Sequence, residues 1–200
     1  MDGCGKTTQL NLLTRGLEQC GYEVVHSREP GGCPISEKIR ELVLDKNNIE
    51  MCMETEALLY AASRAQHVRQ VIRPTMAAGK LLLCDRFVDS SVAYQGAGRE
   101  LGTALISAIN APAVDGTMPD ATVFLSIDRK EALRRRCAAT DPDRIELAGD
   151  DFHSRVEAGY HQLIDSDPRR WIVVDASRTP EEIADEVLTR VLDRLEEVEA

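Results

Sequence analysis

The chain has 200 residues, 43% hydrophobic and 29% charged, which is enough for one globular core and too little for two. Its formal net charge of -10 argues against non-specific binding to nucleic acid or to an anionic membrane surface. If so acidic a protein handles anionic substrates, its cationic side chains must be gathered locally.

Short apolar runs alternate along the chain with longer segments of helical periodicity. The runs are almost continuously apolar, as expected of strands that are buried on both faces. This alternation is typical of an α/β protein in which helices cover both faces of a parallel sheet. The expected strands are residues 23–27, 81–85, 121–127 and 171–176, and the expected helices are residues 6–20, 36–46, 54–79, 100–110, 129–138, 150–166 and 180–198.

The chain begins with MDGCGKTT, which contains the second part of the phosphate-loop pattern G-x-x-x-x-G-K-[ST]. Gly3 and Gly5 let backbone N–H groups close around phosphates at the positive end of the next helix. Lys6 can reach the β- and γ-phosphates, and the Thr7 hydroxyl can bind Mg²⁺. A glycine turn that only caps a helix is the alternative. Because such a loop normally follows a strand, we expect that a first strand is missing before Met1.

Two motifs come directly after expected strands, at the sheet edge where open α/β folds bind ligands. REPGG follows the strand 23–27, although by itself it could be a plain turn. Asp85 is the last residue of the strand 81–85 and Arg86 follows it, a position where an acid can hold hydrated Mg²⁺ and an arginine can clamp a phosphate. A strand-end ion pair is the alternative for these two residues.

Aromatic and basic residues later in the chain suggest contacts to a base and to phosphates. Tyr60 and Arg64 are i, i+4 neighbours, so a ring and a guanidinium share one helix face. A core tyrosine beside a surface cation is the alternative. Arginines also flank a loop containing Pro142 and could close over transferring phosphates, or could form a solvated basic helix end. These arginines are Arg134, Arg135, Arg136 and Arg144.

The motifs GCGKTT, REPGG, EKIR, TEALLYAASR, DRFVDSSVAYQG, DRIE and FHSRVEAGY occur in one order. This series closely resembles bacterial thymidylate kinases over nearly all of the chain. The resemblance implies a three-layer P-loop kinase fold, normally with five parallel strands, in a single domain over residues 1–200 with a lid at about 137–149. It implies Mg²⁺-dependent transfer of the γ-phosphoryl group of ATP to dTMP, giving dTDP, by a cytoplasmic homodimer with no nucleic-acid or membrane partner.

The resemblance also implies roles for particular residues. Tyr60 takes the place of the aromatic residue, usually Phe, that stacks on thymine, and Arg64 matches the arginine at thymine O4. Because Cys4 stands where some members have a loop arginine, the cations at the phosphates are expected in the lid. Catalytic roles are implied for Lys6, Asp85, Arg86 and Arg144. ATP contacts are implied for Gly3, Cys4, Gly5, Lys6, Thr7 and Thr8, and metal contacts for Thr7, Glu29 and Asp85. Substrate contacts are implied for Asp2, Glu29, Arg40, Tyr60, Arg64, Arg86, Ser91, Tyr94 and Gln95.

Two other functions remain open from the sequence. One is a kinase for another nucleotide, such as dUMP or UMP. The other is a non-catalytic remnant that serves only as a binding partner. The missing strand motivates this second possibility. The complete set of predicted catalytic residues argues against it. The six cysteines form no C-x-x-C pair, so we expect reduced thiols, as is usual in the cytoplasm. The longest apolar run is far shorter than the ~18 residues that a membrane span needs.

Overall fold

The structure is a computed structural model that describes residues 3–136 and 143–199. These residues form two compact units. Unit 1 contains the described parts of residues 1–24, 119–140 and 167–200, and unit 2 those of residues 25–118 and 141–166. The single domain expected over residues 1–200 stays a prediction.

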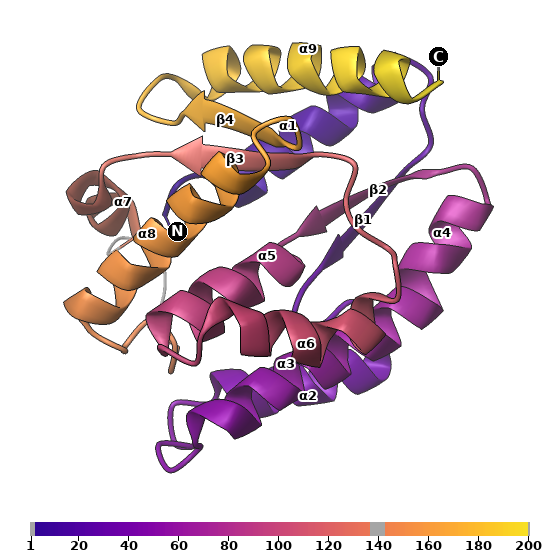
Figure 1. The fold of residues 1–200 in the computed structure, drawn as a ribbon. Helices are drawn as coiled ribbons and strands as arrows, with labels where there is room; N and C mark the ends of the chain where they lie inside the picture. Colours follow the sequence, from indigo (N-terminus) through magenta and orange to yellow (C-terminus); the bar gives the residue numbers. More distant parts are fainter. Residues whose placement is uncertain (1–2, 137–142, 200) are drawn as a thin grey trace. The chain divides into compact units, whose positions relative to one another are not determined.

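Unit 1 is built on a parallel pair of strands and two packed helices (Figure 1). Its elements are α1 (Lys6–Gln19), β3 (Thr122–Ser126), α7 (Arg129–Arg136), β4 (Trp171–Asp175) and α9 (Pro180–Glu199). Thr122 lies opposite Trp171, and Ser126 lies opposite Asp175. Leu17 of α1 and Val187 of α9 are almost completely buried where the two helices contribute to the core of this unit.

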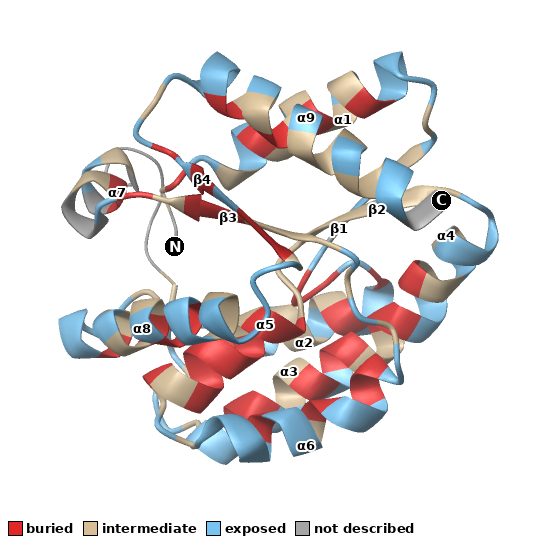
Figure 2. Ribbon diagram, turned by 45° about the horizontal axis from the view of Figure 1, so that its top comes forward, coloured by how far each residue is buried: buried red, intermediate tan, exposed pale blue. Residues whose placement is uncertain are grey.

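Unit 2 contains the other strand pair and a layer of helices (Figure 1). Helix α3 (Met53–His67) packs against both α2 (Pro34–Leu44) and α6 (Thr103–Val114), and their buried faces form much of the core of this unit (Figure 2). The strands of unit 2 are β1 (Val24–Arg28) and β2 (Leu81–Asp85), which pair with each other. Its helices are α2 (Pro34–Leu44), α3 (Met53–His67), α4 (Arg73–Ala77), α5 (Val88–Ser91), α6 (Thr103–Val114) and α8 (Asp150–Ser166), with the π-helical turns η1 (Val68–Ile72) and η2 (Val92–Gly98).

All four expected strands are present, and the alternation of strands and helices is that of the predicted α/β class. Within the described ranges the strands form two separate two-stranded sheets, whereas the resemblance implies one sheet of five strands. The expected helix 54–79 is continuous but contains the π-helical turn η1 between α3 and α4. Among the described residues, no helix is both long and apolar enough to cross a membrane.

The sequence analysis predicted no helix over residues 88–98, yet α5 and η2 occupy this segment. Its glycines lower the intrinsic helix propensity, but they allow a close approach to α8. A Cβ atom on Gly98 would lie 2.7 Å from side-chain atoms of Phe152 and Val156. A Cβ atom on Gly159 of α8 would lie 2.8 Å from the Cβ of Ala97. Tertiary packing therefore outweighs local propensity here.

Candidate functional site

The predicted phosphate loop lies in unit 1 and leads into α1. Gly3 and Gly5 have φ angles of 84° and 91°, in the left-handed region that favours glycine. Gly5 is the residue that caps α1, and its carbonyl accepts a hydrogen bond of 3.0 Å from the Gln9 N–H. Lys6, Thr7 and Thr8 form the first turn of α1, the part of a helix whose backbone N–H groups suit an anion. Cys4 is buried, and the predicted substrate contact Asp2 lies outside the described residues.

Unit 2 brings the acids of the two strand-end motifs onto neighbouring chain segments. The Glu29 N–H donates to the Asp85 carbonyl over 2.9 Å, just beyond the paired strands β1 and β2. Arg86 follows with a φ of 67°, which is uncommon for a residue with a side chain. Its guanidinium carbon lies 5.1 Å from the centre of the Tyr94 ring, a cation–π contact between two predicted substrate residues.

A buried polar network holds the predicted base-reading arginine. The Nε and Nη2 atoms of Arg64 lie 2.8 and 2.7 Å from Oε2 of Glu29. Oε1 of Glu29 lies 2.9 Å from Nδ1 of His67, whose Nε2 lies 2.5 Å from the Ser27 hydroxyl. Arg64, Glu29 and His67 are all buried. Both carboxylate oxygens of Glu29 therefore have side-chain partners, and its predicted contact with Mg²⁺ stays a prediction.

The remaining contacts of Arg64 orient its guanidinium further. Nη1 donates to the Ser91 hydroxyl over 3.1 Å and to Oδ1 of Asn110 on α6. An arginine has five N–H groups, and four of those of Arg64 are directed at these partners and Glu29. Its guanidinium plane is thus fixed before any ligand binds, and a remaining N–H can serve a carbonyl oxygen.

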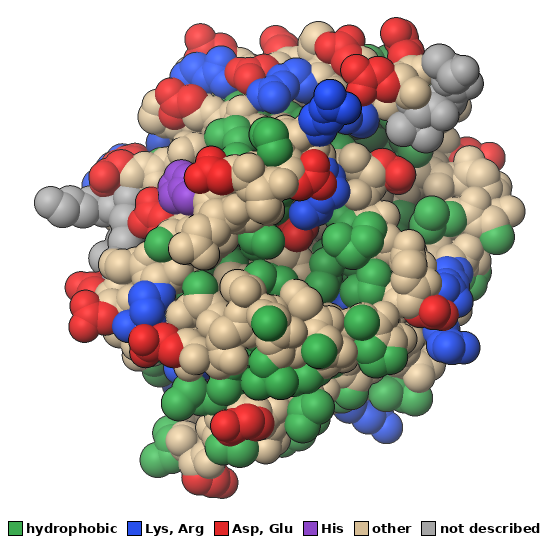
Figure 3. Space-filling view, viewed as in Figure 1, with side chains coloured by type: hydrophobic (Ala, Val, Ile, Leu, Met, Phe, Trp, Pro, Cys, Tyr) green, Lys and Arg blue, Asp and Glu red, His purple; other side chains and the backbone are tan. Residues whose placement is uncertain are grey.

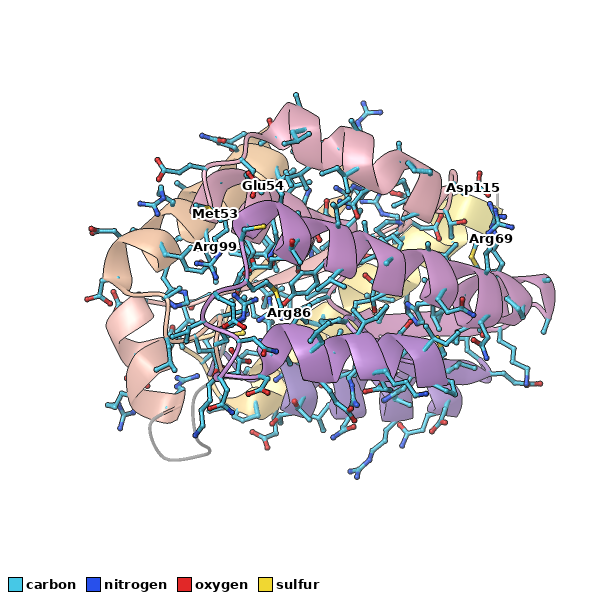
Figure 4. All side chains as sticks on the ribbon, turned by 90° about the horizontal axis from the view of Figure 1, so that it is seen from below. Met53, Glu54, Arg69, Arg86, Arg99 and Asp115 are labelled. Carbon is cyan, nitrogen blue, oxygen red and sulfur yellow. The ribbon has the colours of Figure 1, made fainter. Side chains whose placement is uncertain are left out.

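A second buried cluster surrounds Glu56, at the beginning of α3. Oε1 of Glu56 accepts from Nε2 of Gln95 over 2.9 Å and from Nε of Arg99 over 3.2 Å. Oε2 lies 3.0 Å from Nη2 of Arg99 and 2.8 Å from Nη2 of Arg144. Figure 4 places Arg99 close to Met53, near the first turn of α3. Three elements distant in sequence are thus joined at one carboxylate.

The charge state of Glu56 follows from these partners. Burial by itself raises the pKa of the carboxyl group. The hydrogen bonds from Arg99 and Gln95, together with the charges of Arg99 and Arg144, outweigh that effect and lower the pKa below its ordinary value. Glu56 is therefore an anion at neutral pH, and its two oxygens can only accept hydrogen bonds.

Two predicted phosphate-binding arginines are held by main-chain oxygens. Nη1 of Arg40 donates to the Pro30 carbonyl over 2.8 Å, so Arg40 supports the REPGG turn. Nε of Arg144 donates to the Val43 carbonyl over 2.9 Å, in addition to its ion pair with Glu56. The part of the expected lid at residues 137–142 lies outside the described residues. The predicted contact of Arg144 with transferring phosphates stays a prediction.

The clusters around Arg64 and Glu56 are the two ends of one face of α3. Glu56, Tyr60 and Arg64 follow one another at intervals of four residues, which places them along one side of the helix. Ser91 and Gln95 are also four residues apart, on the facing α5–η2 segment. Ser91 contacts Arg64 and Gln95 contacts Glu56, which leaves Tyr60 between the two contacts. We call these five residues the α3 ladder.

The Tyr60 hydroxyl lies among charged groups of unit 2. Burial and the charge of Glu56 raise the pKa of this hydroxyl, the charge of Arg86 opposes them, and Asp143 and Arg144 have smaller opposite effects. The hydroxyl therefore stays protonated at neutral pH, and the ring remains an uncharged aromatic surface. Arg86, the predicted phosphate arginine, is thus one of the charged groups that act on the predicted base-stacking residue.

The sequence analysis missed several residues that organise the ladder. Glu56 was visible only as part of the motif TEALLYAASR, four residues before Tyr60. Asn110 and Arg99 carried no signal, because their partners are more than forty residues away in sequence. Glu37 was also missed: it accepts from the Gly32 N–H over 2.8 Å and pairs with Arg28 over 3.0 Å.

A glycine loop that begins a helix, and acidic and basic residues after strand ends, define the class of α/β phosphotransferases with a phosphate-binding loop. Comparison with known proteins narrows this class. The thymidylate kinase family matches residues 1–187, so the chain belongs to the thymidylate kinase family.

Individual relatives agree with this membership. The chain is 43% identical to a thymidylate kinase of Geotalea uraniireducens, over 98% of this chain and 95% of the relative. It is 48% identical to one of Pelotomaculum thermopropionicum, over 89% of this chain and 83% of the relative. Its structure superimposes on the crystal structure of thymidylate kinase from Ehrlichia chaffeensis with a TM-score of 0.76 and 30% identity, covering 96% of this chain and 94% of that one. The predicted fold class and family are thereby confirmed.

Proposed function

We propose that this chain transfers the γ-phosphoryl group of ATP to dTMP and forms dTDP. The observation that carries the proposal is the α3 ladder, which presents a donor, an aromatic ring and an amide in succession within unit 2. A thymine ring stacked on Tyr60 could direct its O4 carbonyl at Arg64 and another polar edge at Gln95. Membership in the thymidylate kinase family supports the same substrate.

The phosphate groups are assigned to the cationic residues of each unit. Lys6 and the N–H groups at the beginning of α1 would bind ATP phosphates, with Thr7 and Thr8 beside them. Arg86 and Arg40 would bind the phosphate of dTMP. A phosphate nucleophile needs little help from a base, so these residues act mainly by positioning and by neutralising charge.

We also propose that Mg²⁺ supports the reaction, with Asp85 of unit 2 as the candidate carboxylate, while the contacts of Thr7 and Glu29 with the metal ion stay predictions. Proteins usually hold Mg²⁺ through one or two carboxylates together with substrate phosphates, so a complete protein cage is not needed. Asp85, the last residue of β2, offers one such carboxylate. Bound Mg²⁺ would neutralise charge on the transferring phosphates.

Replacing Tyr60 tests the stacking role of its ring. We expect Tyr60→Leu to raise the KM for dTMP about tenfold, because stacking a base on an aromatic side chain contributes roughly 1–3 kcal/mol. Tyr60→Phe keeps the ring face and should change the KM by less than about twofold. Steady-state kinetics at saturating ATP measure both values. A Tyr60→Phe variant as weak as Tyr60→Leu would assign the effect to the hydroxyl and contradict stacking.

The proposed reaction is tested by offering several nucleotides with ATP and Mg²⁺. The acceptors are dTMP, dUMP, UMP, CMP, AMP and GMP, and the products are separated by chromatography. We expect dTDP from dTMP as the dominant product, in the cytoplasmic setting where ATP is available. Preferential phosphorylation of UMP, CMP or a purine nucleotide would contradict the assignment of dTMP.

We also propose that two copies of this chain associate through the outer face of α2, α3 and α6. Large apolar side chains are exposed on these three adjacent helices, and Figure 3 shows hydrophobic side chains gathered over this part of unit 2. Such a face is costly to leave in water, and cyclic dimers are the commonest assembly that covers one. The residues are Ile35 (53% exposed), Leu42 (46%), Leu58 (55%) and Leu105 (46%).

A charge placed on this face tests the dimer. We expect sedimentation of the unaltered chain to give twice the mass of one chain, and Leu58→Glu to shift it towards the monomer. Met76→Glu is the matched control, because Met76 is 49% exposed on α4, outside the proposed face. A dimer that tolerates Leu58→Glu, or a monomeric unaltered chain, would contradict this interface.

A further inference from the structure

The side-chain amide of Gln95 has only one orientation available in the Glu56 cluster. Nε2 of Gln95 lies 2.9 Å from Oε1 of Glu56. A carboxylate accepts hydrogen bonds and cannot donate them, so the amide must turn its NH₂ group towards Glu56. The carbonyl oxygen, Oε1 of Gln95, is consequently directed away from Glu56. It is the atom left to meet a ligand at this end of the α3 ladder.

The anionic state of Glu56 keeps that orientation fixed. Burial of the carboxylate is offset by two arginines, Arg99 at 3.0 Å and Arg144 at 2.8 Å. If Glu56 were a neutral carboxylic acid or an amide, it could donate to Gln95, and the Gln95 amide could then turn over. The two arginines thus do more than balance charge: they maintain an acceptor-only neighbour for Gln95.

We propose that Glu56 is a positioning residue that sets base specificity, by forcing Gln95 to present an acceptor to a base that carries an N–H donor. This inference rests on the proposed function, in which Gln95 contacts the base. Thymine and uracil carry such a donor at N3, whereas N3 of cytosine is an acceptor and would oppose Oε1 of Gln95. At the other end of the ladder, Arg64 can only donate, which suits the 4-carbonyl of the same bases. A donor from Arg64 and an acceptor from Gln95 together match the 4-carbonyl and the N3–H group of thymine or uracil.

The test measures selectivity rather than activity alone. We expect Glu56→Gln to lower the ratio of kcat/KM for dTMP over dCMP at least about tenfold, because its amide can donate to a turned-over Gln95. The loss should come from KM, and Arg64 should preserve the remaining discrimination at the 4-position. Arg99→Gln is the matched control, since it weakens the same cluster but leaves the Glu56 carboxylate facing Gln95, with Arg144 still 2.8 Å away to keep it an anion. In Arg99→Gln, the ratio of kcat/KM for dTMP over dCMP should stay within about twofold of its value in the unaltered chain.

Two further measurements separate the possible failures. The side-chain NH₂ resonances of Gln95 report its hydrogen bond to Glu56 without any catalysis, and they should shift in Glu56→Gln far more than in Arg99→Gln. If Glu56→Gln does not fold, Glu56→Gln with Arg99→Gln removes one unpaired cation and carries the same test. An unchanged ratio in either folded Glu56 variant, or an equal loss in Arg99→Gln, overturns the role of Glu56 alone. An unaltered chain that does not phosphorylate dTMP overturns the proposed function as well.

Discussion

Replacing Arg64 with leucine is expected to lower kcat/KM for dTMP at least about 100-fold and the free energy of unfolding by about 3–5 kcal/mol. The first effect follows from the loss of the guanidinium that is proposed to donate to the 4-carbonyl of the base. The second follows from Glu29, whose carboxylate would stay buried without the partner that lies 2.7 Å from it. Steady-state kinetics and urea unfolding measure the two effects separately.

Arg69→Leu is the matched control for this substitution. Arg69 lies on η1, one turn beyond α3, and its side chain is 72% exposed beside Asp115. The same change of residue there should cost less than about 1 kcal/mol and leave kcat/KM near its original value. Arg64→Lys separates charge from shape, because it keeps a cation near Glu29 but cannot donate to Glu29 and Ser91 in one plane. Full activity in Arg64→Leu would remove Arg64 from the site.

Replacing Lys6 with methionine is expected to lower kcat for dTMP phosphorylation about 10²–10³-fold with little change in stability. Lys6 is the first residue of α1, directly after the left-handed Gly5, and its side chain is not buried in the core of unit 1. The proposed role of Lys6 is to neutralise the charge that develops on the transferring phosphates. Kinetics at saturating ATP, with unfolding followed in parallel, provide the measurement.

The control for Lys6 is Arg15→Met, which removes one positive charge from the exposed side of the same helix. A general effect of net charge would act on both variants, whereas a phosphate contact is lost only in Lys6→Met. Comparable losses of kcat in the two variants would contradict the assignment of Lys6 to the phosphates.

Strongly patterned elements of the fold could be predicted from the sequence. The four strands are continuous apolar runs, and the helix at residues 150–166 has the bounds expected from its periodicity. The helical segment at 88–98 could not be predicted, because Gly98, which weakens it locally, is also the residue that lets it pack closely against α8. Information about that packing is spread over Gly98, Phe152 and Gly159, which are far apart in the chain.

In the candidate site, too, residues related by a local pattern could be predicted, whereas contacts between distant segments could not. Tyr60 and Arg64 could be singled out because helical spacing relates them, and the resemblance to thymidylate kinases added Ser91 and Gln95. Their buried partners could not be found in this way. Asn110 reaches Arg64 across 46 residues, and Glu56 reaches Gln95 across 39. A pattern within one helix reports which side chains share a face, but it does not report what lies opposite that face.

The crystal structure of this chain with dTMP bound tests the central claim most directly, because it locates the base relative to the α3 ladder. We expect a thymine ring stacked on Tyr60, with its O4 atom at Arg64 and its N3–H group at Oε1 of Gln95. In the same structure, Nε2 of Gln95 should remain bound to Glu56. A thymine ring bound away from Tyr60, or a Gln95 amide that donates to the base, would contradict the account.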